Sequence, residues 1–234
     1  MLDIGATVRQ RRVERDPMSG AVPLLRMALP WVGHRELRSR GTVCGSLAHA
    51  DPAAELPAVA CCLDAEITVT GPQGARRVRA RDFFTGAMTT ALGPNDILTA
   101  LHLPVSRRGE GFGFAEIARR HGDFALAGVA ARVRMDDAGA PEAVITAFGV
   151  SDRPVTRDVT AELTSALGGR SATAEGLGEA LPEALSEAAD QLVNTDGDAH
   201  ASRDYRRRLL RVLAGRELAK AHERARQSAD GVNA

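Results

Sequence analysis

The chain has 234 residues, of which 44% are hydrophobic and 26% are charged, a composition typical of a globular protein with one or two cores. Thirty Lys and Arg residues balance thirty Asp and Glu residues, so no net charge attracts nucleic acid or an anionic membrane. Only 3% of the residues are aromatic, which leaves few surfaces on which bases could stack. The composition argues against a disordered chain, a coiled coil and a nucleic-acid-binding protein.

The N-terminal sequence and the cysteine spacing indicate the cellular compartment. No stretch is long and apolar enough to cross a membrane, and the N-terminal residues lack the apolar core of a signal peptide. Cys44, Cys61 and Cys62 are odd in number, and no CxxC spacing occurs. This pattern argues against a disulfide framework and against a structural zinc site. We therefore expect a cytoplasmic protein with free thiols, no metal of its own and no membrane contact.

The first part of the chain mixes helical and strand patterns. In chain order it predicts a strand entering a helix over 4–13, a helix over 21–29, a Gly-rich loop region over 31–57, a short buried helix over 56–63, a hairpin with strands over 66–70 and 76–79, and a strand over 96–103. The hairpin turn is Gly71-Pro72-Gln73-Gly74, which has the residue types of a tight turn.

The second part begins after a polar stretch over 105–111, which we interpret as a boundary between two units. Beyond it, the sequence predicts an antiparallel meander of three strands over 112–118, 125–135 and 143–150, and then helices over 161–167 ending at Gly168-Gly169, over 173–193 with a break at Pro182, and over 202–226. The prediction is an α+β chain with units 1–107 and 108–226, followed by a disordered tail over 227–234.

The segment from Thr42 to Glu55, TVCGSLAHADPAAE, carries the strongest chemical signal. Gly45 lacks a side chain, so backbone amides there can approach an anion, and the hydroxyls of Thr42 and Ser46 can donate to phosphate oxygens. Asp51 and Glu55 follow as acceptors suited to ribose or ribityl hydroxyls. By itself, such a pattern is more often a plain structural loop than a diphosphate site.

Other motifs support less chemistry. The run GEGFG over 109–113 imitates a nucleotide fingerprint, but it opens a strand instead of a helix and is interpreted as a linker. The sequence has no GxSxG elbow and no cysteine with a histidine at motif spacing, so hydrolase chemistry lacks support. The basic run over 203–211 is interpreted as a terminal helix with its arginines in water.

The segment over 42–55 closely resembles the second flavin motif of the FAD-binding medium subunits of molybdenum hydroxylases, the carbon monoxide dehydrogenase and xanthine dehydrogenase family. That motif has two adjacent glycines, and Cys44 stands here in place of the first. The resemblance continues in order through IGATVRQRRVE, DFFTGAMTTAL, NDILTALHLP, GFAEIARRHGDFALAGVAARV, GVSDRPV and YRRRLLRVL. So many ordered matches are highly specific.

For the fold, the resemblance implies a PCMH-type FAD-binding subdomain followed by an antiparallel sheet with C-terminal helices. Thr42, Gly45 and Ser46 would then lie along the FAD diphosphate, and Glu55 would bond the ribityl chain. Leu98 and Phe124 take positions beside the flavin or adenine, although Leu98 also suits a core and Phe124 a plug between subdomains. With Asp51, the predicted cofactor-binding set is Thr42, Gly45, Ser46, Asp51, Glu55, Leu98 and Phe124. No side chain is implied as catalytic, because the flavin carries the redox chemistry.

For the function, the resemblance implies an electron-transfer subunit with two partners. These are a large subunit with molybdopterin and a small subunit with two [2Fe-2S] clusters, from which electrons would reach FAD and then an external acceptor. The substrate pocket would lie on the large subunit, so the sequence of this chain does not indicate the substrate. The resemblance also implies a preceding subdomain with a first Gly-rich loop, a motif that these 234 residues do not contain. The alternative is therefore a truncated partner subunit that keeps the fold without binding FAD, and we expect the chain alone to hold little flavin.

Overall fold

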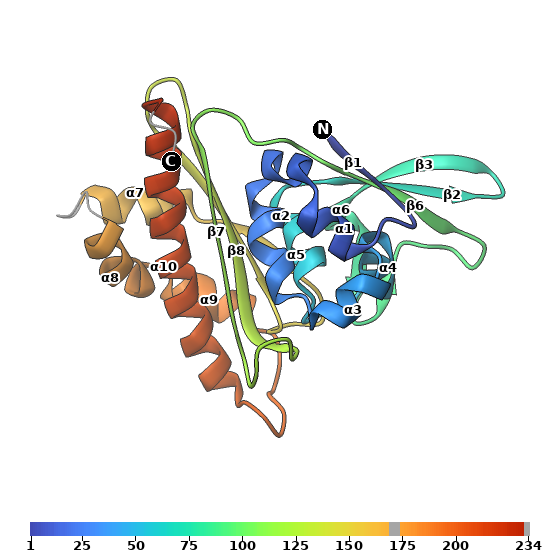
Figure 1. Ribbon diagram of the computed structural model, residues 1–234. Coiled ribbons are helices and arrows are strands. Elements are labelled where there is room, and N and C mark those ends of the chain that lie inside the picture. The colour runs from blue at the N-terminus through green and yellow to red at the C-terminus, as the bar shows by residue number, and fades with distance from the viewer. Residues whose placement is uncertain (169–173, 232–234) are drawn as a thin grey trace.

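The computed structural model describes residues 1–168 and 174–231. Its described residues form two four-stranded sheets in which all neighbouring strands are antiparallel, each accompanied by helices (Figure 1). The first sheet has the order β1-β6-β2-β3 and the second has the order β10-β9-β8-β7, while β4 and β5 form a small separate ladder. The predicted α+β fold is confirmed.

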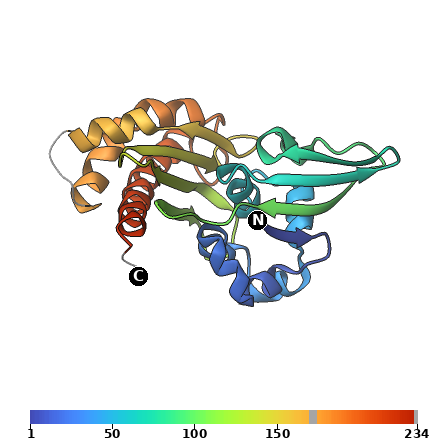
Figure 2. The ribbon, with the colours of Figure 1, turned by 90° about the horizontal axis from the view of Figure 1, so that it is seen from above.

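The first unit alternates short helices with the strands of the first sheet. Its elements are β1 (Leu2–Gly5), α1 (Gln10–Arg15), η1 (Pro17–Ala21), α2 (Pro23–Ala28), η2 (Leu29–Trp31), α3 (Arg35–Arg40), α4 (Val43–His49), α5 (Glu55–Cys62), β2 (Glu66–Gly71), β3 (Gly74–Arg79), α6 (Ala80–Phe83), β4 (Phe84–Gly86), β5 (Thr89–Thr90) and β6 (Ile97–Leu103). The predicted hairpin is confirmed, because β2 pairs with β3 and Gly71 lies opposite Gly74. Figure 2 shows this hairpin extending away from the rest of the molecule.

The loop region predicted over 31–57 is wrong, because it contains the helices α3 and α4. The sequence of α3, RELRSR, shows no apolar periodicity. The one buried side chain of this helix is that of Arg38. Helix α4 begins after Thr42, whose hydroxyl accepts a hydrogen bond from the Gly45 amide at 2.9 Å. A buried guanidinium and a hydroxyl cap stabilise these short helices, and neither produces a hydrophobic pattern in the sequence.

The second unit is the predicted meander with one strand more. Its elements are β7 (Glu110–Ala118), β8 (Ala125–Met135), β9 (Pro141–Phe148), β10 (Val155–Asp158), α7 (Thr160–Gly168), α8 (Ala174–Ala184), α9 (Ser186–Leu192) and α10 (Arg203–Ala229). The prediction of a three-stranded sheet is wrong, because it lacks β10. This strand pairs with β9, and Val155 lies opposite Ala147. None of the four residues of β10 is buried, so this edge strand lacks the buried apolar run that marks the other three.

The C-terminal helices differ from the prediction at two places. Helix α8 continues through Pro182, and the break comes at Leu185 before α9. A Cβ on Gly215 of α10 would lie 2.7 Å from the Pro182 ring, so the missing side chain lets the two helices pack closely there. Helix α10 extends to Ala229, so the prediction that a disordered tail starts at residue 227 is wrong. Gly169, Thr173 and residues 232–234 lie outside the described residues.

The second sheet separates two hydrophobic cores. One face, with Val129 and Ile145 among its buried residues, packs against α7 and α10. The other face, with Phe112, Phe114 and Phe148, packs against α2 and α5 of the first unit. Because α5 lies between the two units, all eight of its residues are buried. The second sheet is therefore a wall shared by both units, and its loops can carry residues to their junction.

The three cysteines are buried free thiols, as predicted. In the part of the chain that the structure covers, no helix has the length and apolar character needed to cross a bilayer. Across the same residues, no three side chains of His, Cys, Asp or Glu gather as a metal site would require.

Candidate functional site

The first turn of α4 presents a small polar surface made by Thr42, Gly45 and Ser46. Gly45 is exposed, and a Cβ built on it would lie 2.5 Å from the Thr42 hydroxyl oxygen. That hydroxyl accepts the Gly45 amide hydrogen, so its own hydrogen remains available to donate. Ser46 is half-buried beside them. The three residues predicted to line a diphosphate are thus together, on a surface that any larger residue at position 45 would obstruct.

Cys44, which stands where the family motif has a glycine, points away from this surface. Its side chain is buried in the core of the first unit, with Sγ 3.5 Å from the carbonyl oxygen of Ile4. Burial raises the pKa of the Cys44 thiol to about 11. The thiol is therefore neutral and inert, and the exchange of glycine for cysteine leaves the exposed turn at Gly45 open.

Asp51 and Glu55 flank the connection between α4 and α5. Asp51 accepts a hydrogen bond from the Ala53 amide at 2.8 Å, which fixes the turn before α5. Glu55, the first residue of α5, is 7% exposed. Burial raises the pKa of Glu55 to about 7, with a smaller contribution from the negative charge of Asp51. Near neutral pH, much of the Glu55 population is protonated and can donate a hydrogen bond as well as accept one.

The second unit contributes a buried carboxyl group that sequence reasoning missed. Glu116 on β7 is 4% exposed, and within the described residues neither of its carboxyl oxygens has a hydrogen-bond partner. Burial raises the pKa of Glu116 to about 8, and repulsion from Glu55 acts in the same direction. The sequence did contain a signal for its burial. Phe112, Phe114 and Glu116 alternate along β7, so all three side chains lie on the same, buried face of the strand.

A cleft of about 500 Å³ opens where loops of the two units meet. Its lining includes Asp51 from the first unit together with Arg119, Asp123, Phe124, His200 and Arg206 from the second. The Phe124 ring is 72% exposed at this cleft. Two of the predicted cofactor-binding residues, Asp51 and Phe124, are therefore brought to one place by the tertiary structure.

Arg206 is a structural member of this cleft and not a solvated arginine of the basic run. Its guanidinium is buried and donates to the carbonyl oxygens of Leu126 at 2.6 Å and Gly149 at 2.7 Å. It also forms an ion pair with Asp198. Together these contacts tie the start of β8, the residue after β9 and the loop before α10 to one charge.

Leu98 lies apart from the cleft. It is 4% exposed on β6, and its side chain belongs to the core of the first unit. Helix α4 packs against β6, and the Leu98 side chain faces the core. The predicted set thus divides between the α4 turn, the cleft, the buried Glu55 and this core position.

Comparisons with known sequences match the chain to two family models and to several relatives. Residues 1–106 match the family described as the FAD binding domain in molybdopterin dehydrogenase, and residues 112–221 match the CO dehydrogenase flavoprotein C-terminal domain. The chain is 32% identical over 232 residues to 6-hydroxypseudooxynicotine dehydrogenase complex subunit alpha of Paenarthrobacter nicotinovorans, covering 98% of this chain and 76% of that one. It is 34% identical over 153 residues to the carbon monoxide dehydrogenase medium chain of Afipia carboxidovorans, covering 65% of this chain and 53% of that one.

Solved structures extend the similarity to the fold. CO dehydrogenase from Oligotropha carboxidovorans matches with a TM-score of 0.82 at 29% identity, covering 95% of this chain and 75% of that chain. Quinoline 2-oxidoreductase from Pseudomonas putida 86 matches with a TM-score of 0.81 at 32% identity, covering 97% and 76%. Both units, the order of the motifs and the fold agree with one assignment. The chain belongs to the family of FAD-binding medium subunits of molybdenum hydroxylases.

Proposed function

We propose that this chain is the electron-transfer subunit of a molybdenum-containing hydroxylase or dehydrogenase complex. It would hold FAD, receive electrons from the iron–sulfur clusters of a small partner subunit and pass them to an external acceptor. A large partner subunit with molybdopterin would oxidise the substrate. The proposal is supported by relatives that are subunits of dehydrogenase complexes and by two units that both match flavoprotein families.

The observation that carries this proposal is the open α4 turn. A Cβ on Gly45 would come within 2.5 Å of the Thr42 hydroxyl, so glycine leaves room for a group that the hydroxyls of Thr42 and Ser46 can contact. A diphosphate fits this donor set, because hydroxyl hydrogens can donate to its oxygens. The bound flavin would supply the capacity to accept electrons in pairs and release them.

The other predicted residues would bind the rest of the cofactor. Glu55, buried and readily protonated, would exchange hydrogen bonds with ribityl hydroxyls. Phe124 exposes its ring at the cleft and would pack against the flavin ring system. Asp51 lines the same cleft and would orient the cofactor beside Glu55.

Glu55→Ala is expected to weaken FAD retention more than Asp123→Ala does. A buried carboxyl group that bonds ribityl hydroxyls contributes about 1.5 to 3 kcal/mol, which corresponds to a roughly tenfold to hundredfold loss of affinity. Asp123 is the matched control, because it is an exposed carboxylate at the same cleft. The measurement is FAD extracted per mole of the tagged full chain after its co-expression and purification with the proposed partner subunits.

Two further measurements on the same preparations complete the test. Far-UV circular dichroism and thermal unfolding verify that both variants fold, and analysis of iron and molybdenum tests the proposed partners. Equal flavin content in the two folded variants would remove Glu55 from the FAD site. A wild-type complex that contains molybdenum and iron but no flavin would support the alternative of a partner subunit without FAD.

A further inference from the structure

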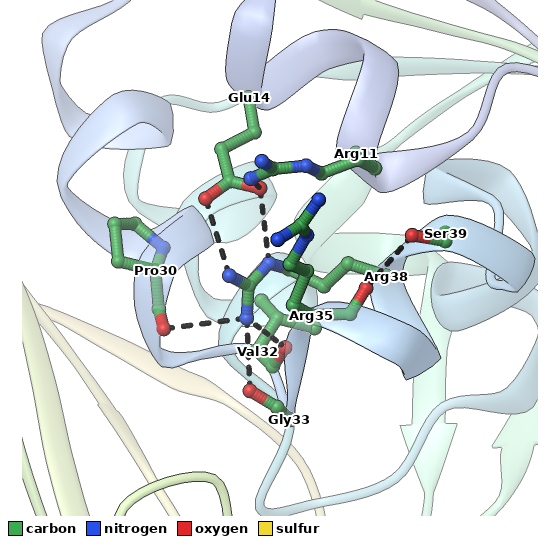
Figure 3. Close-up of polar contacts among 8 residues, drawn as sticks. All are labelled: Arg11, Glu14, Pro30, Val32, Gly33, Arg35, Arg38 and Ser39. Atoms are coloured by element: carbon green, nitrogen blue, oxygen red, sulfur yellow. Dashed lines mark hydrogen bonds and ion pairs between the residues drawn. The ribbon is translucent and has the colours of Figure 1, made fainter.

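Arg38 on α3 is a buried guanidinium with an unusually complete set of acceptors. Its side chain forms a two-pronged ion pair with Glu14 of α1, with Nε 3.1 Å from Oε2 and Nη2 3.2 Å from Oε1 (Figure 3). Although burial acts to raise it, hydrogen bonds from Arg38 and Arg11 leave the pKa of Glu14 below its ordinary value. A buried charge that is paired and hydrogen-bonded in this way is held firmly in one position.

The third nitrogen of the same guanidinium holds the turn between η2 and α3. Nη1 donates to the carbonyl oxygens of Gly33 at 2.9 Å and Val32 at 3.1 Å, and lies 3.5 Å from that of Pro30. Gly33 has a φ of +52°, in the left-handed region that glycine adopts readily. Figure 3 shows these carbonyl groups converging on Arg38. The turn over 30–33 is therefore held by a charge on the helix that follows it.

This turn supports the tip of the β7–β8 hairpin. The ring of Trp31 stacks on that of His121, with centroids 5.5 Å apart and planes inclined by 30°. A Cβ on Gly122 would come within 3.0 Å of the His34 ring and 3.1 Å of the Gly33 carbonyl carbon. The hairpin tip thus rests directly on the turn that Arg38 holds.

The residues that follow the tip line the cleft. Asp123 and Phe124 come directly after Gly122, and both belong to the cleft wall. We infer that Arg38 is a positioning residue for this cleft, which fixes the 30–33 turn and thereby sets where the β7–β8 tip presents Phe124. The part of this inference that concerns flavin binding rests on the proposed function, whereas the mechanical part concerns this chain alone.

Trp31 is the only tryptophan of the chain, so its fluorescence reports the contact with His121 directly. The stacked His121 ring shields one face of the indole, so His121→Ala should increase the quenching of Trp31 emission by added acrylamide in the full chain and shift the emission to longer wavelength. Arg38→Ala should raise the acrylamide quenching constant at least twofold and shift the emission in the same direction, because the freed turn moves away from the hairpin.

Two variants separate this effect from a general loss of structure. Arg40→Ala removes an exposed arginine from the same helix and should leave the acrylamide quenching of Trp31 unchanged. Arg38→Lys retains a buried positive charge, but one ammonium cannot serve both Glu14 and the turn carbonyls, so its quenching constant should lie between those of the wild type and Arg38→Ala. It is the variant that decides if Arg38→Ala fails to fold. A folded Arg38 variant with the same quenching constant as Arg40→Ala would overturn the inference.

FAD extracted from the purified complex distinguishes this inference from the proposed function. If both hold, Arg38→Ala reduces the FAD content several-fold and raises the acrylamide quenching of Trp31. If the quenching rises while the FAD content stays at the wild-type value, Arg38 still positions the hairpin, but the assignment of Phe124 to the flavin site is wrong.

Discussion

Replacing Gly111 with alanine is expected to prevent α10 from packing on the second sheet. A Cβ at this position would lie 2.0 Å from the carbonyl oxygen of Ala221 and 2.3 Å from the amide nitrogen of Ala225. Both atoms belong to the helix backbone, so no side-chain rotation can relieve the overlap. The whole helix would have to move away from β7, which opens the core beneath it. We expect a destabilisation above about 4 kcal/mol, at the upper end of single-residue effects.

The measurement is urea unfolding of the full chain followed by circular dichroism. Gly113→Ala should behave similarly, because its Cβ would lie 2.3 Å from the carbonyl oxygen of Glu217. Gly5→Ala is the matched control on β1, where nothing lies within 4 Å of the added Cβ. An unfolding midpoint of Gly111→Ala equal to that of Gly5→Ala would show that α10 is not seated on β7 as described.

A second large effect is a loss of stability as the pH rises through neutrality. Burial raises the pKa of Glu116 to about 8 from an ordinary value of 4.5, and that of Glu55 to about 7. The folded state therefore binds these protons more tightly than the unfolded state does. Their contribution to stability is complete below pH 4.5, and it is lost progressively as the pH rises through the folded-state pKa values.

Each proton that only the folded state holds changes the free energy of unfolding by about 1.4 kcal/mol per pH unit. The wild-type chain should therefore lose roughly 2 to 3 kcal/mol or more between pH 5.5 and pH 7.5. Glu116→Gln cannot ionise and should show a clearly flatter dependence, with its advantage over the wild type growing as the pH increases. Urea unfolding midpoints across this range provide the measurement. Glu142→Gln, at an exposed position of β9, is the control and should keep the wild-type slope.

A wild-type stability that stays constant or increases across this range would contradict the description of Glu116. Its carboxyl group would then have to find a positive partner or water, in contrast to the unpartnered burial seen here. Equal slopes for the wild type and Glu116→Gln would assign the titration to other groups.

Local pattern was sufficient for the elements that are bounded by clear turn signals. Strand β8 is an apolar run rich in alanine that is buried on both faces, and the turns at its two ends contain glycine and aspartate, so the meander was predictable. The hairpin around Gly71 and Gly74 was predictable for the same reason. The order of the motifs predicted the family, because the residue types and spacing in 42–55 can be compared with a known motif without knowledge of the fold.

The tertiary structure decided the elements and contacts whose stabilising partners lie far away in sequence. Helix α3 forms around Arg38, whose acceptors come from α1 and from the preceding turn, and a polar hexapeptide gives no sign of them. Strand β10 forms because β9 offers a free edge.

The candidate site shows the same division. The sequence by itself determined which residues of the flavin motif are present, because backbone freedom at Gly45 and the hydroxyls of Thr42 and Ser46 are properties of single residues. Only the tertiary structure brought Asp51 to Phe124, turned Leu98 into the core and isolated Glu116 near Glu55. Burial and charge proximity depend on how two units pack, and no local sequence pattern encodes the distance between segments that meet only after folding.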